Sequence, residues 1–216
     1  MLARQTNGAT AAQHQGIAVI VAIIDYKAGN LASVKKAFDY LGAETIVTDD
    51  PWQVGRADKL VLPGVGHFSA TQALNNSGLR ETIGESIRRG VPFLGICLGM
   101  QWMLASSEEA PQIDGLALWP DMCSPFPAGV KSPHVGWNSL EVRDDVSRLM
   151  RGVSAGSFAY FTHSFRVPPL KATIAECEYG GRFSAAVEQD NIFGVQFHPE
   201  KSGKVGLEIL RNFCQC

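Results

Sequence analysis

The sequence has no hydrophobic run long enough to cross a membrane; the longest, Ile17–Ile24, has the length of a strand. Its formal net charge is only −2, which gives no electrostatic case for nucleic acid or for an anionic membrane. No internal repeat and no low-complexity linker divides the chain. A chain of 216 residues can bury a sizeable core, so we expect one domain over residues 17–216.

Cysteine is scarce and unsuited to a structural role. The five cysteines are odd in number, and none has the spacing of metal ligands. We therefore expect free thiols in a reducing cytoplasm, and neither a metal nor a cofactor. The first 16 residues have no apolar secretory segment, no acidic residue and one arginine. We interpret residues 1–16 as a disordered N-terminal extension.

Strand-like and helix-like segments alternate through the first half of the chain. Residues 17–25 form a β-branched apolar run, typical of a central parallel strand. Apolar residues then recur at helical spacing between a predicted N-cap and a glycine stop, at Leu31, Val34, Phe38 and Leu41. Further strands are expected at 44–49, at 57–64 and just before Cys97, with a helical region at 69–89. This alternation predicts a parallel sheet with helices on both faces.

The second half is less regular. Residues 111–145 are rich in Pro, Gly and Asp and predict loops and short strands. Four strand-like segments follow, closer to an antiparallel run, at 157–165, 173–179, 182–188 and 192–198. A final helix is expected to carry Val205, Ile209 and Phe213 on one stripe.

Cys97 lies between glycines where a buried strand is expected to change into a helix opened by Leu98. Such a turn is sharp and admits only small neighbours. We expect the thiol to be exposed at the end of the sheet, where the helix N-terminus favours a thiolate. A free cysteine in an apolar run is more often a plain core residue. Two other stretches favour a nucleophile.

The first is GVQFHPE, which is strand-like into His198. Residues i and i+2 of an extended chain point to the same side, so His198 and Glu200 can converge. Pro199 is expected to prevent an immediate helix. A cysteine nucleophile needs such a base, because a thiol with an ordinary pKa is mostly protonated at neutral pH.

The second is LPGVG, which ends the predicted strand at 57–64. Gly64 and Gly66 allow positive φ, so the loop can aim N–H groups into a pocket. The alternative is an ordinary glycine turn. If this strand neighbours the Cys97 strand, the loop amides and that of Leu98 can hold the oxygen of a tetrahedral adduct.

LPGVG, GICLGMQ and HPEKS, in this order and spacing, resemble the motifs of class I (triad) glutamine amidotransferases. With DYKAGN, PHVGWN and THSF, the chain from about Ile17 to its end is similar to one family of that class. These are the glutaminase subunits of imidazole glycerol phosphate synthases.

The resemblance implies a three-layer α/β/α fold of the flavodoxin-like type, with a mostly parallel sheet and a Cys–His–Glu triad. Cys97 would attack the side-chain amide of L-glutamine, His198 would pass a proton to the departing ammonia, and Glu200 would hold His198. Water would then release glutamate from a thioester. The implied oxyanion donors are Gly64, Val65, Gly66 and Leu98. The residues that match the glutamine pocket are Gln101, Glu109, His163, Ser164 and Phe165.

The resemblance also implies a heterodimer with a (β/α)8 cyclase subunit. Ammonia would cross a shielded interface and react with a ribonucleotide to give imidazole glycerol phosphate, for histidine biosynthesis. The residues that match this interface are Pro133, His134, Gly136, Trp137, Asn138 and Lys201. Without the resemblance, Trp137 would be interpreted as a core residue.

Three residues depart from the family pattern. Lys27 replaces a usual glycine and disfavours positive φ, Phe165 lacks the hydroxyl of a common tyrosine, and Val135 replaces methionine.

Two other functions stay open. The chain could serve another synthetase or act alone on γ-glutamyl conjugates, which PHVGWN argues against. It could also be a non-enzymatic binding subunit, which an intact Cys97, His198 and Glu200 argues against.

Overall fold

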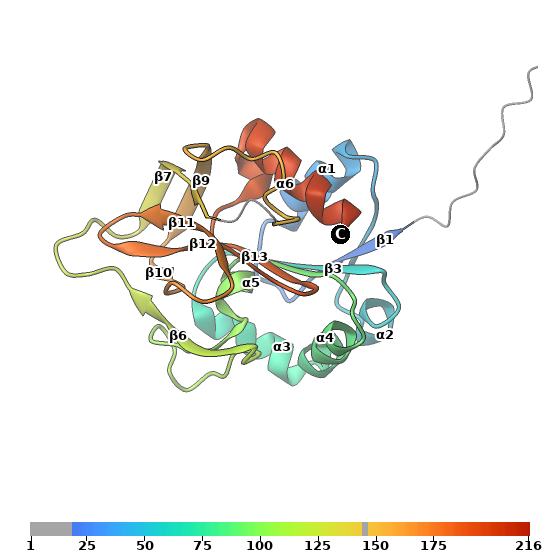
Figure 1. Ribbon diagram of the computed structural model, residues 1–216. Coiled ribbons are helices and arrows are strands. Elements are labelled where there is room, and N and C mark those ends of the chain that lie inside the picture. The colour runs from blue at the N-terminus through green and yellow to red at the C-terminus, as the bar shows by residue number, and fades with distance from the viewer. Residues whose placement is uncertain (1–18, 144–146) are drawn as a thin grey trace, which may run out of the picture.

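The structure is a computed structural model that describes residues 19–143 and 147–216. The extension predicted for residues 1–16 lies outside the described residues. The described part is built around a large central sheet with helices on both of its faces (Figure 1). Two smaller sheets lie at the left of Figure 1, beyond one end of the central sheet.

The central sheet has eight strands. Their order is β2 (Glu44–Thr48), β1 (Ile20–Ile24), β3 (Lys59–Gly64), β4 (Phe93–Cys97), β13 (Ile192–Val195), β12 (Arg182–Gln189), β11 (Thr173–Glu178) and β8 (Glu141–Val142). Neighbours from β2 to β13 are parallel, and the last three strands continue antiparallel. The predicted α/β class with a mostly parallel sheet is confirmed.

Helices cover both faces of this sheet (Figure 1). One face carries α1 (Leu31–Tyr40) and α6 (Gly203–Gln215), whose rings Phe38 and Phe213 meet edge to face at 6.4 Å. The other face carries α2 (Pro51–Val54), α3 (Gln72–Asn76), α4 (Leu79–Arg88) and α5 (Leu98–Gln101). Two hydrophobic clusters, one on each face, form the core.

Local signals explain where most helices begin and end. The Asn30 side chain accepts from the Ser33 amide at 3.3 Å, as expected of the N-cap of α1. The single helical region expected over 69–89 is wrong, because Gly78 takes a φ of +79° and separates α3 from α4. A short 3-10 turn, η1 (Phe68–Thr71), precedes them. Lys27 adopts a φ of 67°, a conformation that its side chain disfavours.

The strand-like segment at 157–165 does not join the antiparallel part of the central sheet. Its residues form β9 (Phe158–His163), paired with β7 (His134–Ser139), and β10 (Phe165–Arg166). β10 belongs to a three-stranded sheet with β6 (Trp119–Pro125) and β5 (Leu104–Ser107). The chain changes sheets at Ser164, which is why one apolar run gives two strands.

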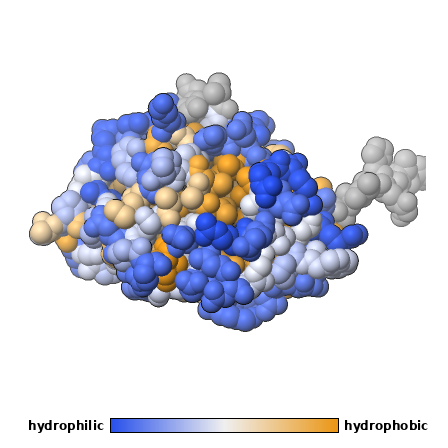
Figure 2. All heavy atoms as spheres, turned by 90° about the horizontal axis from the view of Figure 1, so that it is seen from below, coloured by the Kyte–Doolittle hydropathy of each residue, from blue (hydrophilic) through white to orange (hydrophobic). Residues whose placement is uncertain are grey.

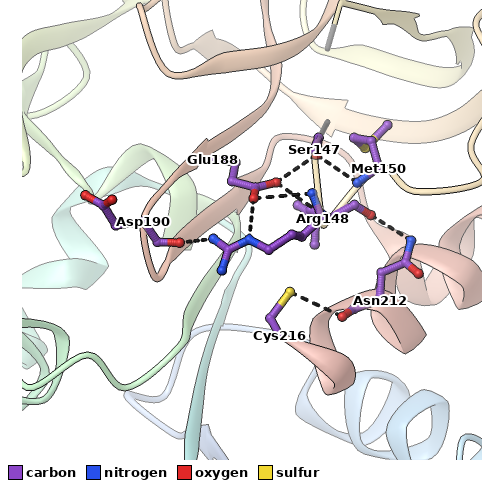
Figure 3. A network of polar contacts seen from close by, with 8 residues as sticks. Ser147, Arg148, Met150, Glu188, Asp190, Asn212 and Cys216 are labelled. Carbon is purple, nitrogen blue, oxygen red and sulfur yellow. Dashed lines mark hydrogen bonds and ion pairs between the residues drawn. The ribbon is translucent and has the colours of Figure 1, made fainter. Parts of the chain in front are cut away.

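A polar network ties the segment before β9 to the far part of the sheet (Figure 3). Glu188 of β12 accepts from Ser147 Oγ at 2.7 Å and from the Leu149 amide at 3.1 Å. Arg148 pairs with the same carboxylate at 2.8 Å. Burial raises the Glu188 pKa, but these donors outweigh it and hold the pKa below its usual value. Asn212 of α6 completes the network by donating to the Leu149 carbonyl at 3.0 Å.

Hydrophilic residues cover most of the face seen from the side of α3 and α4, and the largest hydrophobic area lies near the middle of the view (Figure 2). Within the described ranges 19–143 and 147–216, none of the helices is both long and apolar enough to cross a membrane.

Candidate functional site

Cys97 occupies a strained turn between β4 and α5. Its φ of 54° and ψ of −107° lie outside the regions that side-chain-bearing residues prefer, and such strain gathers at functional sites. The neighbouring glycines are required by close backbone contact: a Cβ on Gly99 would lie 1.9 Å from the Leu62 carbonyl oxygen, and one on Gly95 2.7 Å from Gly99. The predicted sharp turn with small neighbours is therefore present. α5, however, is a single turn of four residues rather than a longer helix.

The expectation of an exposed thiol is wrong, because Cys97 is only 4% exposed. It lies at the wall of a cavity of about 220 Å³. Besides Cys97, the cavity is lined by Gly66, Leu98, Gln101, Glu109, Pro133, Thr162, His163, Ser164 and Phe165. All five residues expected to bind glutamine thus lie together around the cysteine. The thiol is reached through this cavity because strand β9 covers it.

His198 and Glu200 meet beside the cysteine. His198 Nδ1 lies 2.9 Å from Glu200 Oε1, and both side chains are almost fully buried. The extended-chain argument for Glu200 is wrong in detail, because Pro199–Lys201 form a 3-10 turn, η2, directly after His198. Proline is tolerated at the first position of such a turn, where an N–H would be unpaired anyway. The turn still brings the carboxylate back onto the imidazole.

The charge state of His198 is set by its neighbours. Burial by itself lowers the His198 pKa, but the negative charges of Cys97 and Glu200 raise it to about 10. With Nδ1 donating to Glu200, Nε2 is the atom left for Cys97, and it has no hydrogen-bond partner among the described residues. The arrangement favours the imidazolium form of His198.

The glycine loop after β3 lies next to the cysteine, as the oxyanion hypothesis requires. β3 and β4 are parallel neighbours, with Gly64 opposite Cys97. Gly66 has a φ of +108° and lines the cavity, but Gly64 does not use positive φ. Gly64 is needed for space instead: a Cβ there would lie 2.2 Å from the Tyr26 hydroxyl and 2.7 Å from the Leu98 side chain.

Hydrogen bonds hold two polar side chains, Gln101 and Glu109, in the lining of the cavity. Gln101 Nε2 donates to the Phe165 carbonyl at 2.7 Å and to Gln196 Oε1 at 3.2 Å. Glu109 Oε2 accepts from the Phe68 amide at 2.6 Å. Phe165 thus contributes its backbone carbonyl here, a contact that does not depend on the tyrosine hydroxyl it lacks.

His163 and His134 form a buried neutral pair. Burial lowers the His163 pKa to about 3 and the His134 pKa to about 4. His163 Nδ1 donates to the Phe165 carbonyl at 2.8 Å, so its bare Nε2 accepts from His134 Nδ1 at 3.2 Å. His134 also stacks on Tyr179 with ring centroids 3.9 Å apart. The expectation that His134 contacts a partner is wrong: it is 3% exposed because it faces the core.

The outer face of β7 and β9 is exposed and carries large apolar side chains. Strand alternation turns Val135, Trp137 and Phe158 outward, and each is more than half exposed, at 57%, 55% and 55%. The alternative that Trp137 is a core residue is therefore wrong. Gly136 and Asn138 belong to β7, Pro133 precedes it and lines the cavity, and exposed Lys201 lies over the Tyr160 ring of β9 at 5.8 Å. We call Val135, Trp137, Phe158 and Tyr160 the ribbon face.

Two residues next to the thiol were missed by sequence reasoning. Gln196 Nε2 lies 3.7 Å from Cys97 Sγ, and the Thr162 carbonyl lies 3.8 Å from it. Alternation in GVQFH places Gln196 on the same side as His198, so the signal for Gln196 was available. Thr162 could not be found, because it comes from a strand of another sheet. Among the described residues no three metal-ligating side chains are grouped.

The α/β sheet, the strained cysteine and the histidine–carboxylate pair together define a class of protein that transfers acyl groups through a thiol. Residues 22–216 match the family model described as glutamine amidotransferase class-I. The chain is 48% identical to the imidazole glycerol phosphate synthase subunit HisH of Methanothermobacter thermautotrophicus, covering 91% of this chain and 98% of that protein. For the HisH subunit of Moorella thermoacetica the identity is 46%, over 89% and 93%.

The chain belongs to the class I glutamine amidotransferase family, in the group that contains the HisH subunits. Solved structures with low sequence identity share the fold. A crystal structure of a glutamine amidotransferase superposes with a TM-score of 0.72 at 17% identity, covering 91% of this chain and 97% of that one. The structure of PurLQS from Thermotoga maritima gives 0.71 at 19% identity, over 91% and 97%.

Proposed function

We propose that this chain is the glutaminase subunit of an imidazole glycerol phosphate synthase, hydrolysing L-glutamine and passing ammonia to a cyclase subunit. The observation that carries the proposal is the cavity of about 220 Å³, which places Cys97 among acceptors suited to an amino acid. The HisH relatives are named as subunits of an imidazole glycerol phosphate synthase, which supports a partner subunit. We place the protein in the cytoplasm, consistent with its five free cysteines.

The free acceptors of the cavity suit the ammonium of an amino acid. Both N–H groups of the Gln101 amide are used, one on Phe165 and one on Gln196, which leaves Oε1. Glu109 uses one carboxylate oxygen on the Phe68 amide, which leaves the other. An amide oxygen and a carboxylate oxygen together favour a cationic group. The side-chain amide of the same glutamine would then extend toward Cys97.

Attack by the Cys97 thiolate on the glutamine side-chain carbonyl forms a C–S bond and a tetrahedral oxyanion. The amides of Val65, Gly66 and Leu98 are the proposed donors to that oxygen, and Gly64 provides the room they need. Losing one such donor typically costs about 100-fold or more in rate. The proton on His198 Nε2 goes to the leaving nitrogen as the C–N bond breaks, and ammonia departs.

Hydrolysis of the γ-glutamyl thioester closes the cycle. His198, now neutral, takes a proton from water as the water oxygen attacks the thioester carbon. The C–S bond breaks, glutamate leaves, and the thiolate and imidazolium are restored. Glu200 holds His198 Nδ1 throughout, so the same Nε2 serves as acid and then as base.

The ribbon face is the proposed surface for the cyclase. It presents an exposed tryptophan with apolar neighbours, the composition of an interface anchor. Thr162 of the same strand β9 contacts the thiol of Cys97 through its carbonyl, so one strand borders both the surface and the nucleophile. A short route for ammonia follows from this closeness. Lys201 is a neighbouring cation for a partner carboxylate.

The test is glutamate release from glutamine by the purified chain, with and without the cyclase subunit and its ribonucleotide ligand. Low activity alone and strong activation in the complex are expected, with loss of activity in Cys97→Ala. Trp137→Ser should weaken binding of the cyclase by at least about 10-fold, as for a typical anchor residue. Trp52→Ser, at another exposed tryptophan on helix α2, is the matched surface control.

Other outcomes would support the alternatives. Strong activity that ignores the cyclase would favour a glutaminase that acts alone or serves another synthetase. A glutamine-mimicking electrophile should label Cys97 and leave Cys97→Ala unlabelled. Absence of any adduct in the complex would favour a non-enzymatic subunit.

A further inference from the structure

Gln196 connects the cavity to the nucleophile. It follows β13, is completely buried, and donates its backbone amide to Ala185 at 2.8 Å. Its side chain has one end 3.2 Å from Gln101 Nε2 and the other 3.7 Å from Cys97 Sγ. Because both the oxygen and the nitrogen of this buried amide are in contact, its orientation is fixed. The orientation decides whether the amide donates a hydrogen bond to the sulfur.

The contacts fix which end of the Gln196 amide faces the thiol. The Phe165 carbonyl can only accept, so Gln101 must present its NH2 group there, at 2.7 Å. The second N–H of that group reaches Gln196 Oε1. The NH2 group of Gln196 therefore points to Cys97 Sγ. Reversing Gln196 would place two NH2 groups against each other and an oxygen against the sulfur.

Two neighbours of Cys97 favour opposite protonation states of its side chain. The Thr162 carbonyl, 3.8 Å from Sγ, can only accept and therefore stabilises the protonated thiol. The Gln196 N–H can only donate to the sulfur and therefore stabilises the thiolate. His198 is also a donor, but in the reaction it gives its proton away. The Gln196 amide does not titrate, so its donor remains through every step.

We propose that Gln196 is a further residue of the reaction, a permanent hydrogen-bond donor that stabilises the Cys97 thiolate. Gln101 acts as a positioning residue, because it imposes the orientation of Gln196 from the Phe165 carbonyl at the cavity floor. The reaction served rests on the proposed glutaminase function. The contact with the sulfur stands without it and is tested without glutamine.

The first test is the rate at which iodoacetamide alkylates Cys97 at neutral pH, with the adduct located by mass spectrometry. Gln196→Met keeps the volume and removes the donor, and should slow alkylation about 10-fold, the scale of a hydrogen bond to a charged group. Thiolate absorption in the ultraviolet should fall in parallel. Gln53→Met, on the exposed side of α2, is the matched control and should react like the wild type.

Gln101→Met tests the orientation argument, because Gln101 does not contact the sulfur. Freeing Gln196 to rotate should slow alkylation by a smaller factor than Gln196→Met does. Gln196→Glu keeps the acceptor for Gln101 but places a carboxylate oxygen at the thiol, and should be the slowest of the three. It also replaces Gln196→Met if that variant does not fold.

Wild-type alkylation rates in a folded Gln196→Met chain, or faster alkylation in Gln196→Glu, would overturn the proposal. Because the reagent needs neither glutamine nor the cyclase, the two proposals fail separately. If Gln196→Met slows alkylation but the wild-type chain has no glutaminase activity with the cyclase, only the proposed function is contradicted.

Discussion

Lys27 holds a left-handed backbone conformation, φ 67°, between two aspartates. Its amide donates to Asp25 at 2.8 Å, and its Nζ lies 3.0 Å from Asp25 and 3.1 Å from Asp49. A non-glycine residue is strained in this conformation, and the two exposed ion pairs offset that strain. This offset is how the site accepts a lysine.

We expect Lys27→Gly to leave the free energy of unfolding nearly unchanged, because relief of backbone strain offsets the lost ion pairs and the greater flexibility of the unfolded chain. Lys27→Ala keeps the strain and loses the ion pairs, and should be less stable than Lys27→Gly. Urea unfolding of both variants measures the difference. Equal stabilities would show that backbone strain is absent at this position.

The Tyr26 hydroxyl is buried without a hydrogen-bond partner among the described residues, against Gly64. Burial and the charge of Cys97 both raise its pKa, so it stays protonated. An unpaired buried hydroxyl is destabilising, so Tyr26→Phe should raise the free energy of unfolding by about 1 kcal/mol.

The matched control is Tyr179→Phe, because the Tyr179 hydroxyl donates to the Lys131 carbonyl at 2.8 Å. That variant should be less stable than the wild type. Thermal melts of the two variants compare the two hydroxyls directly. A loss of stability in Tyr26→Phe would mean that its hydroxyl is paired in solution.

Among the elements, α6 sets the position of Glu200. Gly206 lies in its first turns, and a Cβ there would be 1.9 Å from the Pro199 carbonyl oxygen in η2. Gly206→Ala must push η2 outward and with it the carboxylate that holds His198. We expect the free energy of unfolding to fall by about 2 kcal/mol because of overpacking. Glutaminase activity should fall at least about 10-fold, because a displaced catalytic group slows the reaction by that factor or more.

Gly84→Ala in α4 is the control for this prediction. A Cβ at Gly84 meets only the Leu116 side chain, at 3.8 Å. At this half-buried position in the helix interior, alanine in place of glycine should raise stability by about 0.5–1 kcal/mol. Activity and unfolding of the two variants, measured together, separate the contact with η2 from helix propensity. Normal activity in Gly206→Ala would contradict the link between α6 and Glu200.

Elements with strong local signals could be predicted from the sequence. The β-branched run of β1, the Asn30 cap of α1 and the glycine-flanked Cys97 turn each carry their own physical cause. The four-residue helix α2 was missed, although Asp50 caps it by accepting from the Trp52 amide at 2.9 Å, because so short an element has no periodicity. The division of 157–165 between two sheets depends on β6 and β7, which lie far away in the sequence.

The candidate site was predictable where neighbours in sequence are neighbours in space. The pairing of His198 with Glu200 is of this kind. The burial of His134 was not predictable, because it depends on stacking with Tyr179 and on the partner His163 from β9. Long-range contacts of this type leave no local pattern.

At the scale of the whole molecule, stability should depend on acid through His134 and His163. Both are buried neutral, with pKa values lowered from 6.5 to about 4 and about 3, while the unfolded chain takes up protons below 6.5. The contribution of these two histidines to stability is therefore full above pH 6.5 and falls as the pH drops toward 4. Each histidine adds a slope of about 1.4 kcal/mol per pH unit.

His134→Phe preserves the stacking and removes one of these protons. We expect the slope of unfolding free energy against pH, between 6.5 and about 4, to be smaller by about 1.4 kcal/mol per unit than in the wild type. Urea unfolding at a series of pH values gives both slopes, and the titrating groups that do not contact His134 cancel in their difference. Identical slopes would mean that His134 is already charged in the folded chain.

The position of β13 between β4 and β12 has a consequence for synthesis on the ribosome. The strand that ends at Cys97 has one edge paired with β3, but its other edge must wait for Ile192–Val195 near the chain's end. A nascent chain therefore exposes an open strand edge from the synthesis of β4 until that of β13, which invites association with other chains or a chaperone. The same delay means that the nucleophile meets its base only after His198 has been synthesised. A truncated product would carry the thiol without the means to use it.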